Sequence, residues 1–136
     1  GYKDGLAAAG IPLDEQLIQI GDYSISSAVA PTRNLLALPD PPTAIFASND
    51  MSAIGVYRAA EEAGLRIPED LSVIGFDNLH DSVYLNPPLT TIDQFISETG
   101  SIAVDMIVQL IKGEALPKHI HKMPTQLVIR KSCRPI

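Results

Sequence analysis

Three short polar segments follow apolar runs of the sequence: Gly21-Asp22-Tyr23, Ser48-Asn49-Asp50 and Phe76-Asp77-Asn78. A carboxylate can accept hydrogen bonds from two hydroxyl groups, an amide can both donate and accept, and a tyrosine ring can stack on an apolar ring face. Asp77, Asn49 and Tyr23 together therefore suit a neutral, hydroxyl-rich small molecule such as a sugar or a nucleoside.

The same residues also have plain structural roles open to them. Asn49 and Asp50 precede a helical pattern, and both residue types are common N-caps. Asp77 could hold a turn, and Tyr23 could cover an edge of the core. We expect Asp50 to cap the helix and Asn49 to bind the ligand.

Enzymatic sites find little support in the sequence. It contains no G-x-x-x-x-G-K-[ST], G-x-G-x-x-G or G-x-S-x-G motif. His119-x-His121 lacks a nearby cysteine or carboxylate, His80-Asp81 is typical of a surface turn, and Cys133 has no histidine at a motif spacing. An α/β enzyme with Asp77 or Asp50 as general base is an alternative without a nucleophile, metal cluster or phosphate loop to complete it. We expect no catalytic residue, metal or cofactor.

Alternating strand and helix patterns position the three polar segments. Apolar runs predict strands at 17–20, 43–47, 71–76, 89–92 and 125–130. The 43–47 run is nearly continuous, which is typical of a strand buried on both faces. This alternation predicts an α/β, three-layer αβα architecture around a mostly parallel sheet, in which ligands lie beyond the C-terminal ends of the strands.

Helical patterns fill the intervals between the strands. Helices are predicted over 1–10, from Ser26 or Ser27 to about Leu38, over 51–63, around 81–84 and over 97–112. Gly10 and Gly64 are placed to end two of them. Pro31 is expected in the first turn of its helix, where the missing N–H has no intrahelical partner to lose.

Composition excludes several classes of protein. Of 136 residues, 46% are hydrophobic and 19% charged, which suits a globular core rather than a disordered chain. A net charge of −6 argues against a surface that binds nucleic acid by itself. The single cysteine, Cys133, cannot form an internal disulfide and fits a reducing compartment. No apolar run approaches the roughly 18 residues that a membrane span needs.

Five motifs in register carry a resemblance to a known family. They are PTAIFASND at 42–50, A-x-G with AA-x-x-x-G at 53–64, IPEDLSVIGFD at 67–77, PPLTTI at 87–92 and LVIR-x-S at 127–132. Their order and spacing, over nearly the whole chain, closely resemble the lactose-repressor/galactose-repressor family of bacterial transcription regulators.

The resemblance implies the C-terminal lobe of a two-lobed effector-binding module with a type I periplasmic-binding-protein-like fold. The effector of such proteins sits between the lobes. Residue by residue, Asn49 and Asp77 match the family's ligand-contacting Asn and Asp, and Tyr23 falls where a stacking aromatic usually lies. Gln94 matches a polar contact at the crossover between lobes.

The resemblance also implies partners. The chain would be the effector-binding and dimerisation module of a cytoplasmic transcriptional repressor or regulator, with a sugar or sugar derivative as effector. Contact with DNA would pass only through an N-terminal helix-turn-helix outside this chain. Val83, Tyr84 and Leu85 are candidate residues of a homodimer interface, with local core packing as an equal alternative.

The family's topology divides the chain into segments. Residues 1–88 would belong to the C-terminal lobe, 89–124 to a crossover and a helix of the N-terminal lobe, and 125–136 to a return strand. The family's effector-contacting arginine and most of the N-terminal lobe would lie upstream of Gly1. We therefore expect the apolar stripe of helix 97–112, which contains Ile102, Met106, Ile107 and Leu110, to lack its partner and to expose apolar surface.

An extracytoplasmic solute-binding protein for sugar uptake is the main alternative, since it would share the fold and the ligand class without DNA. The closing LVIR-x-S motif and Cys133 favour the regulator.

Overall fold

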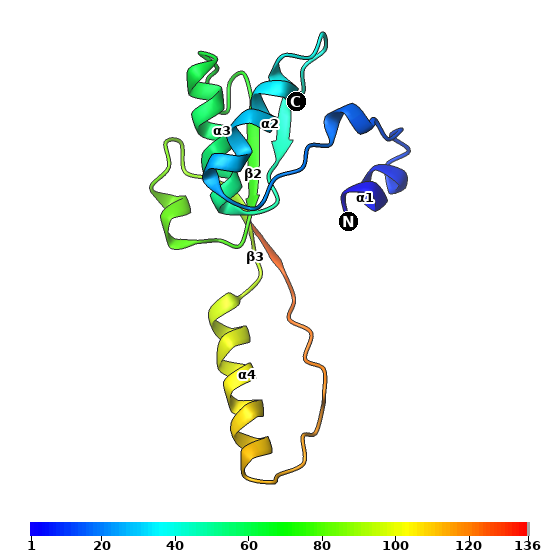
Figure 1. The fold of residues 1–136 in the computed structure, drawn as a ribbon, viewed down its shortest axis with the longest axis vertical. Coiled ribbons are helices and arrows are strands. Elements are labelled where there is room, and N and C mark those ends of the chain that lie inside the picture. Colours follow the sequence, from blue (N-terminus) through cyan, green and yellow to red (C-terminus); the bar gives the residue numbers. More distant parts are fainter. Residues whose placement is uncertain (136) are drawn as a thin grey trace.

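A computed structural model describes residues 1–135; residue 136, the last of the predicted return segment, lies outside the described residues. The elements in chain order are α1 (Tyr2–Ala8), the 3₁₀ helix η1 (Glu15–Leu17), α2 (Ile25–Leu36), β1 (Ala44–Phe46), α3 (Asp50–Glu62), β2 (Ser72–Phe76), the 3₁₀ helix η2 (His80–Val83), β3 (Thr90–Asp93), α4 (Ile96–Ile111) and β4 (Gln126–Val128). Figure 1 shows two regions: a body that contains α2, α3 and the sheet, and an arm, residues 96–125, that projects from it.

The sheet has the strand order β1-β2-β3-β4. β1, β2 and β3 are parallel, with Phe46 opposite Ile74 and Phe76 opposite Ile92, whereas β4 pairs antiparallel with β3. This confirms the predicted α/β class with a mostly parallel sheet. Because the three parallel strands are in register, the segments that follow them meet at one edge of the sheet.

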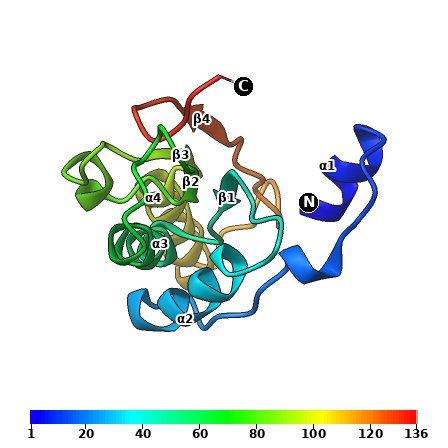
Figure 2. The same cartoon turned by 90° about the horizontal axis from the view of Figure 1, so that it is seen from above.

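Helices α2 and α3 cover one face of this sheet, and α1 lies apart from it (Figure 2). The expectation that 43–47 is buried on both faces is wrong. Ile45 and Ala47 are buried beneath the helices, but Ala44 is exposed and Phe46 is 51% exposed. Their side chains point to the opposite face, because successive side chains alternate along a strand.

The core lies between the two helices and the sheet. Leu71, Val73 and Leu89 are among its fully buried side chains, and they pack with small residues of α3 such as Ala53. Gly55 lets α2 approach closely, since a Cβ at this position would collide with the backbone oxygen of Ile25 in α2.

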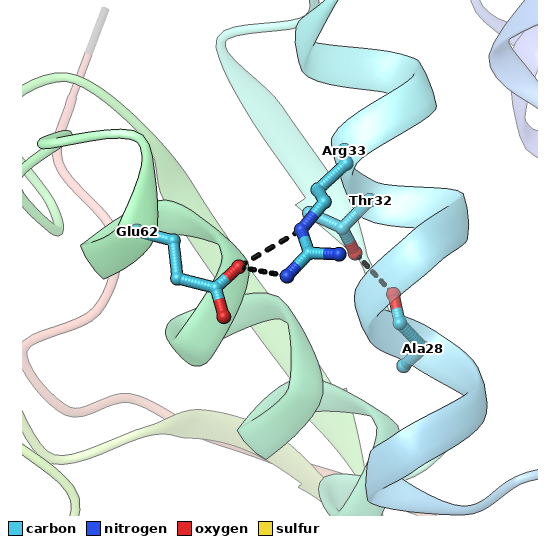
Figure 3. Close-up of polar contacts among 4 residues, drawn as sticks. All are labelled: Ala28, Thr32, Arg33 and Glu62. Carbon is cyan, nitrogen blue, oxygen red and sulfur yellow. Dashed lines mark hydrogen bonds and ion pairs between the residues drawn. The ribbon is translucent and has the colours of Figure 1, made fainter.

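Figure 3 shows a polar contact between α2 and α3 and another within α2. Arg33 donates from Nε and Nη2 to Oε2 of Glu62 at 2.9 and 2.6 Å, in an exposed ion pair. Thr32, which is buried, donates its hydroxyl to the backbone oxygen of Ala28 at 2.7 Å. Exposed pairs contribute about 0–1 kcal/mol, so the packing of the two helices rests mainly on their buried faces.

Helix α2 begins earlier than its sequence predicts. Ser24 is the N-cap, because its hydroxyl accepts the backbone N–H of Ser27 at 3.2 Å. The expectation of a cap at Ser26 or Ser27 is therefore wrong. Pro31 consequently lies in the middle of the helix rather than in its first turn.

The predicted strand at 17–20 is also wrong. Asp14 accepts the backbone N–H of Gln16 and starts a 3₁₀ turn over Glu15–Leu17. Ile18 is extended, yet Ile20 is 90% exposed and no described strand pairs with this segment.

The other predicted elements are confirmed within a few residues. Gly10 and Gly64 both have φ near +70°, as helix C-terminal glycines require. The segment at 81–84 forms η2, and α4 and β4 lie at the predicted sites.

The arm confirms the expectation of an unpartnered helix. α4 has no buried residue, and Ile107, Leu110 and Ile111 are 55, 56 and 79% exposed. None of the helices in residues 1–135 combines the length and apolarity needed to cross a bilayer.

Candidate functional site

The predicted ligand residues follow the C-terminal ends of the parallel strands. Asn49 lies three residues beyond Phe46, and Asp77 lies three residues beyond Ile74, which is the partner of Phe46 in the sheet. Gln94 follows β3 directly. The register therefore brings all three segments to the edge at which ligands bind in open parallel sheets.

Tyr23 and Asn49 are held together. The Asn49 amide donates from Nδ2 to the backbone oxygen of Tyr23 at 3.0 Å. Its Oδ1 accepts the N–H of Ser52 at 2.8 Å, so Asn49 is also the N-cap of α3. Tyr23 has φ +68° and is 65% exposed, which leaves its ring free at the surface.

Asp77 and Gln94 form the second pair. Gln94 donates from Nε2 to Oδ1 of Asp77 at 2.5 Å. Burial raises the pKa of the Asp77 carboxyl above its ordinary value; the hydrogen bond from Gln94 opposes this rise, and the charge of Asp50 adds to it. The described contacts occupy only Oδ1, so Oδ2 can accept a hydroxyl donor.

Asp50 does not cap α3, contrary to expectation. Its side chain is 1% exposed and turns toward β2 and β3. Oδ2 accepts the backbone N–H of Leu79 at 2.7 Å, and Oδ1 accepts the hydroxyl of Thr91 at 2.6 Å. Gly75 leaves room for it, because a Cβ there would collide with Oδ1. A buried carboxylate with both oxygens occupied supports the loop after β2 and is poorly placed to act as a general base.

Asp22 shapes the loop that carries Tyr23. Its carboxylate accepts the N–H of Ser24 at 3.0 Å, and its own N–H donates to the hydroxyl of Ser27 at 3.1 Å. Hydrogen bonds from Ser24 and Ser27 lower the pKa of Asp22 to about 2. Asp22 therefore remains ionised at neutral pH, and its hydrogen bonds to Ser24 and Ser27 fix the backbone on either side of Tyr23.

The site is an open edge and not an enclosed cavity of the described residues. A groove of about 290 Å³ lies elsewhere, along the outer edge of β1 beside residues 17–21, and its lining is largely apolar. Of the three polar segments it reaches Gly21 and Ser48 but none of the four predicted ligand residues. The polar side chains at the strand ends, not the size of the groove, make this edge the candidate site.

The candidate interface residues have different environments. Val83 and Tyr84 are 39 and 72% exposed, and the Tyr84 ring packs edge-on against His80 with centroids 5.2 Å apart. Leu85 is half-buried and packs against the core. Val83 and Tyr84 are therefore accessible to a partner subunit, whereas Leu85 packs locally against the core.

Sequence reasoning missed a polar cluster beside Asp77. Asn78 donates from Nδ2 to Oδ2 of Asp93 at 2.9 Å, and Nη2 of Arg130 donates to Oδ1 of Asn78 at 2.6 Å. The sequence held only indirect signals: Asn78 ends one of the three polar segments, and Arg130 lies in the LVIR-x-S motif. Within residues 1–135, no group of three or more His, Cys, Asp or Glu side chains could hold a metal ion.

Comparison with known proteins places this geometry in a family. The model of the periplasmic binding protein-like domain matches residues 1–133. Among curated relatives, the HTH-type transcriptional repressor PurR of Photobacterium profundum is 38% identical over 134 residues, and the repressor CytR of Escherichia coli K12 is 39% identical over 134 residues. Each alignment covers 98% of this chain but only 40% and 39% of the relative.

Solved structures agree. A LacI-type transcription regulator from Bifidobacterium animalis matches with a TM-score of 0.92 and 32% identity, over 99% of this chain and 49% of that one. A LacI family regulator from Enterococcus faecium with bound ribose matches with a TM-score of 0.88 and 34% identity, over 99% and 50%. The chain belongs to the periplasmic binding protein-like domain family, in the form that LacI-type transcriptional regulators carry.

Proposed function

We propose that this chain is the effector-binding part of a transcriptional repressor and that its effector is a neutral, hydroxyl-rich small molecule. The observation that carries the proposal is the meeting of Tyr23, Asn49, Asp77 and Gln94 at the C-terminal edge of three parallel strands. The relatives, which are repressors, favour a regulator over the alternative of an extracytoplasmic solute-binding protein.

Each side chain retains capacity for a ligand. Oδ2 of Asp77 can accept a hydroxyl, and the Asn49 amide keeps one N–H and one lone pair beyond its two internal hydrogen bonds. The exposed Tyr23 ring can stack on the apolar face of a sugar or base. Gln94 can exchange its bond to Asp77 for one to the ligand.

The charge of the strand-end segments favours a neutral ligand over a phosphorylated one. Residues 21–27, 47–50, 77–79 and 93–96 contain carboxylates but no lysine or arginine. A phosphate would approach Asp22 and Asp77 without a cation from these segments to offset the repulsion. The guanidinium of Arg130, the cation beside Asn78, already donates to Asn78, Ser82 and Leu89. The ribose held by the Enterococcus faecium regulator is a neutral sugar of the kind we propose.

The proposed mechanism uses two lobes. The arm would belong to the second lobe, which is completed by residues outside this chain, and the effector would lie between the lobes. Binding would favour one arrangement of the lobes through its higher affinity for that arrangement. We further propose that the protein acts in the cytoplasm without enzymatic activity, that Val83 and Tyr84 contribute to a homodimer, and that a helix-turn-helix outside this chain contacts DNA.

A thermal-shift screen of the full-length protein tests the proposal. The compounds are neutral sugars, nucleosides and matched sugar phosphates, including ribose and ribose 5-phosphate. The variants are Asp77→Ala and the control Asp81→Ala, which removes an exposed carboxylate on η2 instead of the half-buried one that follows β2. A ligand that binds only the native state raises the melting temperature by mass action.

We expect one neutral compound to stabilise both the wild type and Asp81→Ala but not Asp77→Ala. Stabilisation by sugar phosphates alone would contradict the neutral ligand class. Stabilisation that persists in Asp77→Ala would move the site away from the strand ends.

A further inference from the structure

The arm joins the body at two places, and one side chain contacts both. The chain leaves the body through Asp93, Gln94 and Phe95 at the end of β3, and it returns through β4 and Arg130 (Figure 1). Asn78, in the loop after β2, donates to the Asp93 carboxylate at 2.9 Å and accepts from the Arg130 guanidinium at 2.6 Å. The β3–β4 pairing already joins the exit of the arm to its return, and the Asn78 amide ties both of them to the loop after β2.

Each partner of Asn78 also holds its own segment. Oδ1 of Asp93 accepts the N–H of Phe95 at 2.7 Å, and Phe95 is the N-cap of α4 with φ +55°. Arg130 donates from Nη1 to the backbone oxygen of Leu89 at 2.7 Å and to the hydroxyl of Ser82 at 3.0 Å. Loss of the Asn78 side chain would leave these local bonds and the β3–β4 backbone pairing in place, and would remove the side-chain link from the loop after β2 to the two connections.

The loop that carries Asn78 is itself rigidly held. The N–H of Asp77 donates to the oxygen of Ile92 at 2.8 Å, and that of Leu79 donates to the buried Asp50 at 2.7 Å. Asp77 and Asn78 have φ +115° and +55°, so this loop adopts a backbone conformation that non-glycine residues rarely take. These bonds fix Asp77 and Asn78 as one unit, so a displacement of either residue displaces the other.

We propose that Asn78 is a positioning residue that sets the direction in which α4 leaves the body and couples this direction to the loop that presents Asp77. The coupling to an effector rests on the proposed function, because it takes Asp77 as the ligand contact. The positioning of α4 does not depend on it and can be tested without a ligand.

Asn78→Gly is the sharpest variant. Glycine adopts φ near +55° without strain, so the loop backbone is retained while both side-chain hydrogen bonds are lost. Asn34→Gly is the matched control: it removes an exposed asparagine from α2 and lowers stability through helix propensity alone. Asp93→Asn is a second variant: its amide oxygen can still accept the N–H of Phe95, while its NH₂ group, turned toward the amide of Asn78, cannot accept from it, so the exit side of the link is released.

The measurement is the alignment of backbone N–H vectors in α3 and α4, from residual dipolar couplings of the isotopically labelled chain. In the wild type, both helices should report the same degree of alignment. In Asn78→Gly we expect the apparent order of α4 to fall by about half or more, with α3 unchanged, as for an element that reorients independently. Asp93→Asn should show a smaller fall, and Asn34→Gly none.

The proposal is overturned if α4 keeps wild-type alignment in Asn78→Gly, or if Asn34→Gly lowers it equally. Should Asn78→Gly lose the amide protection of α3, so that the body no longer folds, Asp93→Asn decides by the same criterion. These outcomes are independent of the ligand screen. A failed screen with a mobile arm in Asn78→Gly would reject the proposed function and keep the positioning role.

Discussion

The body and the arm each contain an amphipathic helix, and the two helices have opposite surroundings. In α3, Ala53, Ala59 and Ala60 are fully buried against the sheet and α2. In α4 the apolar residues are larger, yet none is buried and Ile111 is 79% exposed. An apolar stripe thus indicates that a helix face is built to be covered, but only the packed partner determines the stability it contributes.

The largest expected difference comes from truncating one leucine in each region. Leu71→Ala removes a side chain that is 1% exposed, so the lost burial and the resulting cavity should cost about 2–5 kcal/mol of unfolding free energy. Leu110→Ala, at 56% exposure, should change it by less than about 0.5 kcal/mol. Urea denaturation measures both, and equal costs would show that α4 is as well packed as the body.

Two helical glycines give the next comparison. Gly55→Ala places a methyl group against Ile25 and 2.6 Å from the Cβ of Ala28, and this overpacking should cost about 1–3 kcal/mol. Gly100→Ala in α4 meets nothing within 4 Å and should increase helix stability by about 0.5–1 kcal/mol. Thermal unfolding of the two variants should shift in opposite directions; destabilisation by Gly100→Ala would reveal a partner for α4.

The exposed stripe of the arm should also drive self-association of this chain. Sedimentation equilibrium should show a mass that rises with concentration, and Ile107→Lys should weaken the association by about tenfold, or about 1.4 kcal/mol, because it adds a charge to the apolar stripe. Ser101→Lys adds the same charge at an exposed polar position of α4 and serves as the control. A monomer at every concentration would contradict this expectation.

The smallest effect is an acid response of the body. Arg66 donates to both oxygens of Asp70 at 2.8 and 2.9 Å, and this contact lowers the pKa of Asp70 from 3.8 to about 2. The stabilisation is therefore complete above about pH 4 and is lost as the pH falls toward 2. Between about pH 4 and pH 2, urea denaturation should show a larger loss of unfolding free energy for the wild type than for Asp70→Asn. Parallel plots of unfolding free energy against pH for the two proteins would show that the ion pair contributes nothing.

Much of the body could be predicted from its sequence, because local patterns agree with the final packing. Helix α3 has a capping residue, an apolar face and a terminal Gly64, and all three fit its place in the fold. The segment at 17–20 has an apolar run without a strand beside it, and β1 has helices on only one face. The predictions of a strand at 17–20 and of burial on both faces of 43–47 failed for this reason: both depend on neighbouring elements that a local sequence pattern does not contain.

The place of the candidate site residues at the strand ends was predictable, but their contacts were not. The strand-end rule located Asn49 and Asp77 from sequence alone. It could not show that Asp50 turns inward to support the next loop, since side-chain direction at a helix start depends on tertiary packing. The Asn78 link was equally hidden, because its partners are 15 and 52 residues away in the chain.

Isothermal titration of the stabilising compound from the screen into wild-type, Asp77→Asn and Asp81→Asn full-length protein tests the central claim most directly. Asp77→Asn keeps the shape of the side chain and removes its charge, and hydrogen bonds to a charged group contribute about 1.5–3 kcal/mol. We therefore expect Asp77→Asn to weaken binding by about 10- to 150-fold and Asp81→Asn to leave it unchanged. Equal affinity of wild-type and Asp77→Asn protein would contradict the strand-end site.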